Sequence, residues 1–116
     1  MEWCRIDGDI AEELGKALPV DEEIQDLSEF LKVFGDPSRL RILYFLREKP
    51  LCVHDLSRLT GLQQTAVSHQ LKMLRHMRLV KYVKEGRMAV YSLNDSHIGQ
   101  ILDIGLKHLG EENGNG

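Results

Sequence analysis

Cysteine is scarce in this chain, and long apolar runs are missing from it. Its 116 residues include 2 cysteines, too few for a disulfide framework and in keeping with a reducing compartment. No stretch approaches the roughly 18 consecutive apolar residues of a transmembrane helix. The acidic residues Glu2, Asp7 and Asp9 are atypical of a secretory signal peptide. We therefore expect a single-domain cytoplasmic protein without a membrane partner, and its hydrophobic fraction of 42% is enough for a modest core.

The net charge of −3 hides a separation of charge along the chain. Residues 1–31 contain ten acidic and two basic side chains, whereas residues 69–88 contain six basic side chains and one acidic side chain. A basic stretch confined to one segment is typical of a surface that contacts phosphate groups. A solvated charged face without a nucleic-acid partner is the alternative explanation.

Apolar residues recur at helical spacing in several segments, separated by Gly and Pro. Asp36 followed by Pro37 is a strong start signal for a helix, and Gly61 is a typical helix end. Residues 1–20 are expected to form a mobile N-terminal arm and residues 112–116 a disordered tail. The predicted helices span residues 22–34 (for dimerisation), 38–48, 53–60, 64–77 and 95–111.

After Leu79 the period changes from helical to alternating. Residues 80–83 and 88–93 predict two short strands around a turn at Glu85-Gly86. The resulting fold is mainly α with a small β-hairpin, and its element order over residues 38–93 is that of a winged helix-turn-helix. In such folds the second helix of the pair enters the major groove of DNA, and the hairpin reaches the flanking backbone.

The last predicted helix carries two pairs of metal-ligating residue types, Asp95 with His97 and His108 with Glu111. Asp95 lies at the helix entrance, where the backbone need not be helical. A helix rises about 1.5 Å per residue, so His97 and His108 share a face but lie roughly 16 Å apart. One helix cannot close both pairs on one ion, but two antiparallel copies would form two tetrahedral sites suited to Zn²⁺. The spacing predicts a homodimer and a metal site together.

Ordinary solvent-facing histidines and carboxylates on an exposed helix are the alternative to this metal site. A hydrolytic zinc centre is not expected, because both carboxylates act as ligands and no coordination position stays open. Nucleophile and general base are also missing from the motifs. We therefore expect that the protein is not an enzyme and has no small-molecule substrate.

Three short motifs lie in the predicted winged helix-turn-helix, at residues 35–43 (GDPSRLRIL), 51–56 (LCVHDL) and 66–74 (AVSHQLKML). With the C-terminal pattern Asp-x-His and His-x-x-Glu, they make residues 27–111 resemble the ArsR/SmtB family of metal-sensing transcriptional repressors. The resemblance implies a prokaryotic homodimer that binds operator DNA when metal-free and releases it when metal-loaded. Gln63 is a departure, since members often begin the recognition helix with a small hydroxyl residue, a better helix cap.

The resemblance also implies a candidate second metal site. Cys52 is similar to the family's cysteine at the start of the short helix, and Asp55 matches an acid used by some members. His54 stands where cadmium- and lead-sensing members carry a second cysteine, and Cys4 is available as the N-terminal ligand that completes such sites. Thiolate with imidazole suits Zn²⁺ or the softer Cd²⁺. The alternative is a buried structural Cys52, a capping Asp55 and an unbound Cys4.

The candidate DNA contacts come from one face of the predicted recognition helix and from the hairpin. Glutamine pairs well with adenine, whereas Lys72 and Arg75 are expected to follow the phosphate backbone. Lys84 and Arg87 flank the hairpin tip and are expected to reach phosphate or the minor groove. Besides Arg75, the candidate contacts are Gln63, Gln64, Thr65, Ser68, His69, Lys72, Lys84 and Arg87.

We therefore expect a metal-responsive repressor that binds double-stranded operator DNA as an apo homodimer. Zn²⁺ is the expected regulatory ligand, and Cd²⁺, Co²⁺, Ni²⁺ and Pb²⁺ are the other candidates. Two alternatives stay open: a thiol- or redox-responsive repressor of the same fold that uses Cys4 and Cys52, and a cytosolic metal-buffering protein without an operator.

Overall fold

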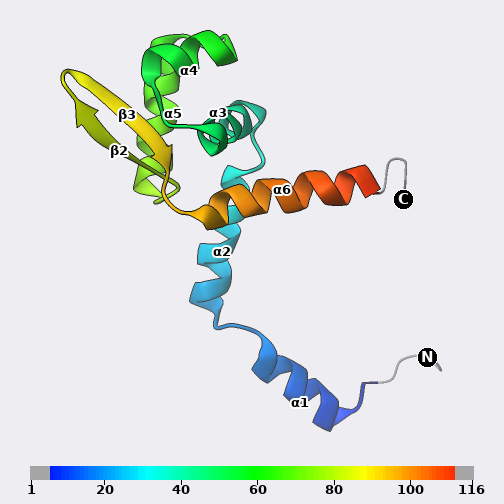
Figure 1. The fold of residues 1–116 in the computed structure, drawn as a ribbon. Coiled ribbons are helices and arrows are strands. Elements are labelled where there is room, and N and C mark those ends of the chain that lie inside the picture. The colour runs from blue at the N-terminus through cyan, green and yellow to red at the C-terminus, as the bar shows by residue number, and fades with distance from the viewer. Residues whose placement is uncertain (1–5, 112–116) are drawn as a thin grey trace. The chain divides into compact units, whose positions relative to one another are not determined.

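The computed structural model describes residues 6–111, which fall into two units, one up to Val33 and one from Phe34 onward (Figure 1). The first unit contains helices α1 (Gly8–Ala17) and α2 (Asp21–Val33). The bounds of α2 agree closely with the predicted helix over residues 22–34. Helix α1 was not predicted, and it lies within the segment expected to be an arm; its N-cap Asp7 accepts a hydrogen bond from the backbone N–H of Ile10 at 3.0 Å. The tail over residues 112–116 lies outside the described residues.

The second unit contains the helices of the predicted helix-turn-helix. Their end signals act as the sequence predicts: Asp36 accepts from the backbone N–H of Arg39 at 3.2 Å, and Gly61 adopts a left-handed conformation with φ of 79°. These caps satisfy polar groups at the helix ends that have no partner within the helix. The helices are α3 (Pro37–Glu48), α4 (Val53–Thr60), α5 (Gln64–His76) and α6 (Ser96–Gly110).

The sheet is antiparallel and has three strands in the order β1-β3-β2. The predicted hairpin is present as β2 (Val80–Glu85) and β3 (Met88–Leu93), and Gly86 in its turn has a φ of 65°. Strand β1 (Leu51–Cys52) was not predicted, because two residues are too short to show a period. It pairs with β3 and so joins the α3–α4 connection to the hairpin.

The core of the second unit lies between α3, α4, α5, the start of β2 and α6. Helices α3 and α5 each contribute three buried residues to this core. The buried apolar side chains are Ile42, Leu43, Leu46, Leu56, Val67, Leu71, Leu74, Leu79, Val80, Ile98 and Leu102. In Figure 1 the β2–β3 hairpin extends to one side of α5, as in a winged helix-turn-helix. No helix within residues 6–111 is long and apolar enough to cross a membrane.

Candidate DNA-binding surface and metal-ligand pairs

Helix α5 is amphipathic in the sense that DNA recognition requires. Val67, Leu71 and Leu74 are buried on its inner face, which fixes the helix against the core. Every residue predicted to contact DNA is exposed, both on the outer face of α5 and beside Gly86 at the hairpin tip. These exposed residues are Gln63, Gln64, Thr65, Ser68, His69, Lys72, Lys84 and Arg87.

The turn between α4 and α5 is held mainly from the α4 side. Gln63 is the N-cap of α5 but makes no side-chain capping hydrogen bond, as the sequence predicts for a glutamine there. The Ser57 hydroxyl instead donates to the Leu62 carbonyl at 2.5 Å, and the Leu62 N–H donates to the Thr60 hydroxyl at 3.2 Å. These bonds fix where the first turn of α5 begins.

One side-chain contact crosses this turn. Nε2 of Gln64, the first residue of α5, lies 3.2 Å from Nδ1 of His54 in the first turn of α4. The sequence pattern predicts His54 as a metal ligand and Gln64 as a DNA contact, and it gives no sign that the two side chains meet.

Arg75, which the sequence predicts to follow the phosphate backbone, is exposed and also contacts the hairpin. Its guanidinium lies over the ring of Tyr82 on β2, 4.9 Å from the ring centroid. Tyr82 in turn packs against Tyr91 on β3, with 5.4 Å between ring centroids. Arg75 therefore joins the end of α5 to the hairpin. This contact depends on how the two elements pack against each other, and a single sequence does not show that packing.

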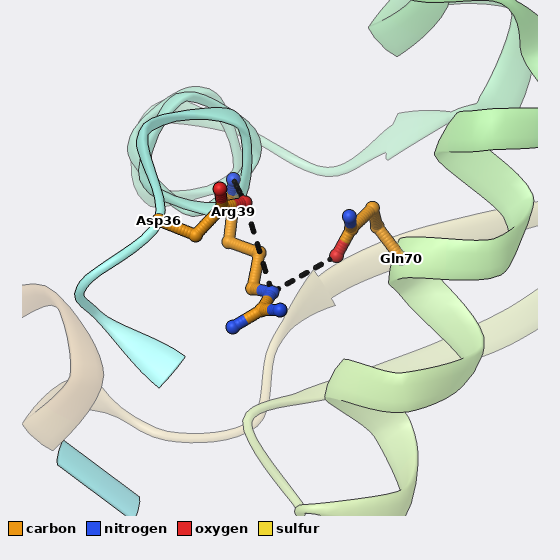
Figure 2. A network of polar contacts seen from close by, with 3 residues as sticks. All are labelled: Asp36, Arg39 and Gln70. Atoms are coloured by element: carbon orange, nitrogen blue, oxygen red, sulfur yellow. Dashed lines mark hydrogen bonds and ion pairs between the residues drawn. The ribbon is translucent and has the colours of Figure 1, made fainter. Parts of the chain in front are cut away.

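A second polar contact ties α5 to α3 (Figure 2). Nε of Arg39 donates to Oε1 of Gln70 at 3.1 Å and lies 3.7 Å from Oδ2 of Asp36. Asp36 is also the N-cap of α3, so one carboxylate holds both the helix start and the arginine. The same motif that predicts the start of α3 therefore also positions the recognition helix.

Helix α6 is joined to α3 by an ion pair. Nη2 of Arg47 lies 2.7 Å from Oδ1 of Asp103, and this hydrogen-bonded carboxylate raises the pKa of Arg47. Gly99 of α6 lies beside the Arg47 side chain, and a Cβ added there would lie 3.5 Å from Cγ of Arg47, an ordinary van der Waals distance. Together with the Arg39–Gln70 contact, this ion pair makes α3 the common neighbour of α5 and α6.

The first predicted ligand pair is brought together at the start of α6. Asp95 has an extended backbone and caps the helix, because its Oδ1 accepts from the backbone N–H of His97 at 2.9 Å. The same oxygen lies 3.1 Å from Nδ1 of His97. Two ligands of a tetrahedral zinc ion with bonds near 2.0 Å are about 3.3 Å apart, so these two side chains have the spacing of a ligand pair.

The second predicted pair, His108 and Glu111, lies at the other end of α6, and both side chains are exposed. The backbone N–H of Glu111 bonds to the carbonyl of His108, so the two residues are one helical turn apart. Within residues 6–111 of one protomer, no three His, Cys, Asp or Glu side chains are close enough to hold a metal. The two predicted ligand pairs, called half-sites below, therefore lie apart at the two ends of α6 in one chain.

The candidate second site is incomplete in the described part of the chain. Cys52 is a free, partly exposed thiol at the N-cap of α4, while His54 and Asp55 are exposed in the first turn of that helix. These three do not form a three-ligand cluster. Cys4 lies outside the described residues.

Comparison with known proteins adds three findings. The profile described as bacterial regulatory protein, arsR family, matches residues 36–82. The chain is 42% identical over 90 residues to a transcriptional repressor SmtB homolog of Synechocystis sp., covering 78% of this chain and 68% of that protein. It is 44% identical over 91 residues to the HTH-type transcriptional regulator NmtR of Mycobacterium tuberculosis, covering 78% of this chain and 76% of that protein.

The structural comparison agrees with the sequence comparison. The solution structure of apo-NmtR matches with a TM-score of 0.70 at 42% identity, covering 85% of this chain and 83% of that one. The winged helix-turn-helix fold and the family resemblance predicted from the motifs are thus confirmed. The chain belongs to the ArsR family of bacterial transcriptional regulators.

Proposed function

We propose that the protein is a cytoplasmic, metal-responsive transcriptional repressor. It binds double-stranded operator DNA as a metal-free homodimer and is released when zinc or a related divalent metal binds. The observation that carries this proposal is the pairing, in one unit, of an exposed polar face on α5 with two half-sites at the ends of α6. The relatives named as SmtB and NmtR support the repressor and regulator role.

The exposed apolar surface of α6 supports a dimer. Ile98 and Leu102 lie on the apolar face of α6, but they are buried within the chain itself and contribute little to an interface. Ile104, Leu106 and Leu109 instead expose 69%, 55% and 53% of their surface. Leu106 and Leu109 border an apolar groove of about 610 Å³ between α3 and α6, which a second copy would cover.

The half-sites would be completed across this dimer. Asp95 and His97 of one protomer and His108 and Glu111 of its partner supply two imidazoles and two carboxylates, a set that zinc accepts. The bound ion supplies a cross-link between two copies of α6. Which of Zn²⁺, Cd²⁺, Co²⁺ or Ni²⁺ acts in the cell depends on coordination geometry and availability more than on this ligand set.

The internal contacts of the second unit support a route by which α6 would influence DNA binding. Asp103 on α6 holds Arg47 on α3, and Arg39 on α3 holds Gln70 on α5. A change in the packing of α6 on α3 would therefore be passed to α5 through these two contacts. A dimer binds DNA only when its recognition helices match the spacing of the half-sites, so a modest shift lowers affinity.

The proposal is tested by binding of the full-length protein to DNA from upstream of its own gene. We expect tight binding in the presence of a chelator, a dimeric mass at micromolar concentration, and loss of at least tenfold in affinity at saturating zinc. This corresponds to a coupling free energy of about 1.4 kcal/mol or more. A monomer, or operator affinity that zinc leaves unchanged, would contradict the proposal.

Cys4, Cys52, His54 and Asp55 are proposed as a second, softer site. The partial exposure of Cys52 supports access of a metal to its thiol. Thiolate ligands favour Cd²⁺ or Pb²⁺ over harder ions.

A further inference from the structure

The contact between His54 and Gln64 joins the two helices of the helix-turn-helix at the point where DNA would be read. His54 is the second residue of α4 and Gln64 is the first residue of α5, and both side chains are exposed. The turn between them is fixed by the Ser57 and Thr60 hydroxyls. The two side chains therefore extend from a turn that is held by hydrogen bonds, and Nδ1 of His54 lies 3.2 Å from Nε2 of Gln64.

The chemistry of the two groups gives this contact a direction. A neutral imidazole with its proton on Nε2 accepts a hydrogen bond at Nδ1, and the carboxamide of glutamine donates through its nitrogen. With one N–H held by His54, Gln64 presents its oxygen and its second N–H outward. Those are the two groups that glutamine uses when it binds adenine through N6 and N7.

We propose that His54 is a positioning residue for base readout. It orients the carboxamide of Gln64, and it thereby sets the base preference at the position that Gln64 reads. A free glutamine side chain samples many rotamers and both amide orientations, so a fixed one loses less entropy on binding. This inference rests on the proposed DNA-binding function.

The test measures discrimination by the metal-free, full-length protein. The probe is an operator selected by the wild-type protein from random DNA, together with every single base-pair substitution of it. A good two-bond side-chain contact to a base is worth roughly five- to 150-fold in discrimination. We expect Gln64→Ala to lose this factor at one base pair, and His54→Ala to lose at least about threefold at the same base pair.

Three further variants separate positioning from other roles. His54→Asn should restore discrimination, because its side-chain oxygen can accept in place of Nδ1. In the double variant His54→Ala/Gln64→Ala, the loss should equal that of Gln64→Ala alone. His76→Ala, an exposed histidine at the far end of α5, is the matched control and should leave discrimination unchanged.

Two outcomes would overturn the inference while leaving the proposed function intact. One is wild-type discrimination in His54→Ala. The other is an equal loss of affinity on all sequences that persists in the Gln64→Ala background, which would mean that His54 itself contacts DNA.

A measurement without DNA separates failure of this inference from failure of the proposed function. The side-chain NH₂ resonances of Gln64 should shift in His54→Ala and return in His54→Asn, because the hydrogen bond exists in the free protein. Unchanged resonances in His54→Ala would overturn the positioning role even if DNA binding were normal. A wild-type protein that bound no DNA would refute the proposed function, and base readout with it.

Discussion

Asp95 has two roles that substitution can separate, as the cap of α6 and as a proposed metal ligand. Its Oδ1 accepts from the backbone N–H of His97 at 2.9 Å, and this bond satisfies one donor at the start of the helix. Asparagine caps about as well as aspartate, whereas alanine does not cap, at a cost of about 1 kcal/mol. Asp95→Ala should therefore lower the unfolding free energy of the apo protein by about 1 kcal/mol, and Asp95→Asn should leave it nearly unchanged.

Zinc binding should follow a different order. Both variants lose the anionic oxygen, so both should lose zinc affinity by at least the roughly ten- to hundredfold that is typical of a weakened metal site. Urea unfolding in a chelator, at one fixed protein concentration, measures the first effect, and competition with a chromophoric chelator measures the second. Gln100→Ala, an exposed position one turn into α6, is the control for both.

The two roles of Asp95 are refuted by different results. Wild-type zinc affinity in Asp95→Asn would show that the carboxylate is not a ligand. Unchanged apo stability in Asp95→Ala would show that the capping bond contributes nothing.

The other predictions concern the wing, the thiol and the far half-site. Lys84→Ala and Arg87→Ala should each reduce the salt dependence of operator binding by about one unit of slope, measured by titration at several salt concentrations, without changing base preference. Cys52→Ser should abolish thiolate-to-metal absorption of the Cd²⁺ complex in the ultraviolet, yet keep zinc-driven release; lost zinc release would reverse the ranking of the two sites. His108→Gln should still bind zinc weakly but not release DNA at saturation, because a ligating imidazole also uses its second nitrogen to hold neighbouring structure. Wild-type coupling in that variant would exclude His108 as the route of the signal.

Helices whose ends are marked by capping residues, proline or glycine could be predicted from the sequence. Helix α3 begins where Asp36 and Pro37 predict, and α4 ends at Gly61, because capping and left-handed conformations are local properties of those residues. Strand β1 could not be predicted, because its two residues are defined only by pairing with β3, some 40 residues later in the chain. The capping residue Asp7 could have predicted the start of helix α1, but Asp7 is one of several acidic residues in this segment and does not stand out among them.

The candidate site was predictable as a surface but not as a set of contacts. Exposed polar residues at helical spacing identify the outer face of α5. The bond from His54 to Gln64 and the stacking of Arg75 on Tyr82 join different elements, and periodicity does not report such pairs. The apolar stripe of α6 was ambiguous for a related reason: Ile98 and Leu102 face the chain's own core, and a stripe does not reveal which neighbour covers it.

Strand β3 has a consequence for which changes of length the protein tolerates. It begins next to Arg87 at the hairpin tip and ends two residues before Asp95, so one short segment sets the spacing between a proposed DNA contact and a proposed metal ligand. Deleting one residue within it would turn every following side chain to the opposite face of the sheet and rotate the start of α6. Insertions and deletions between Arg87 and Asp95 should therefore abolish metal-dependent release of DNA, whichever residues are added or removed. The same changes after Glu111 should leave that response unchanged.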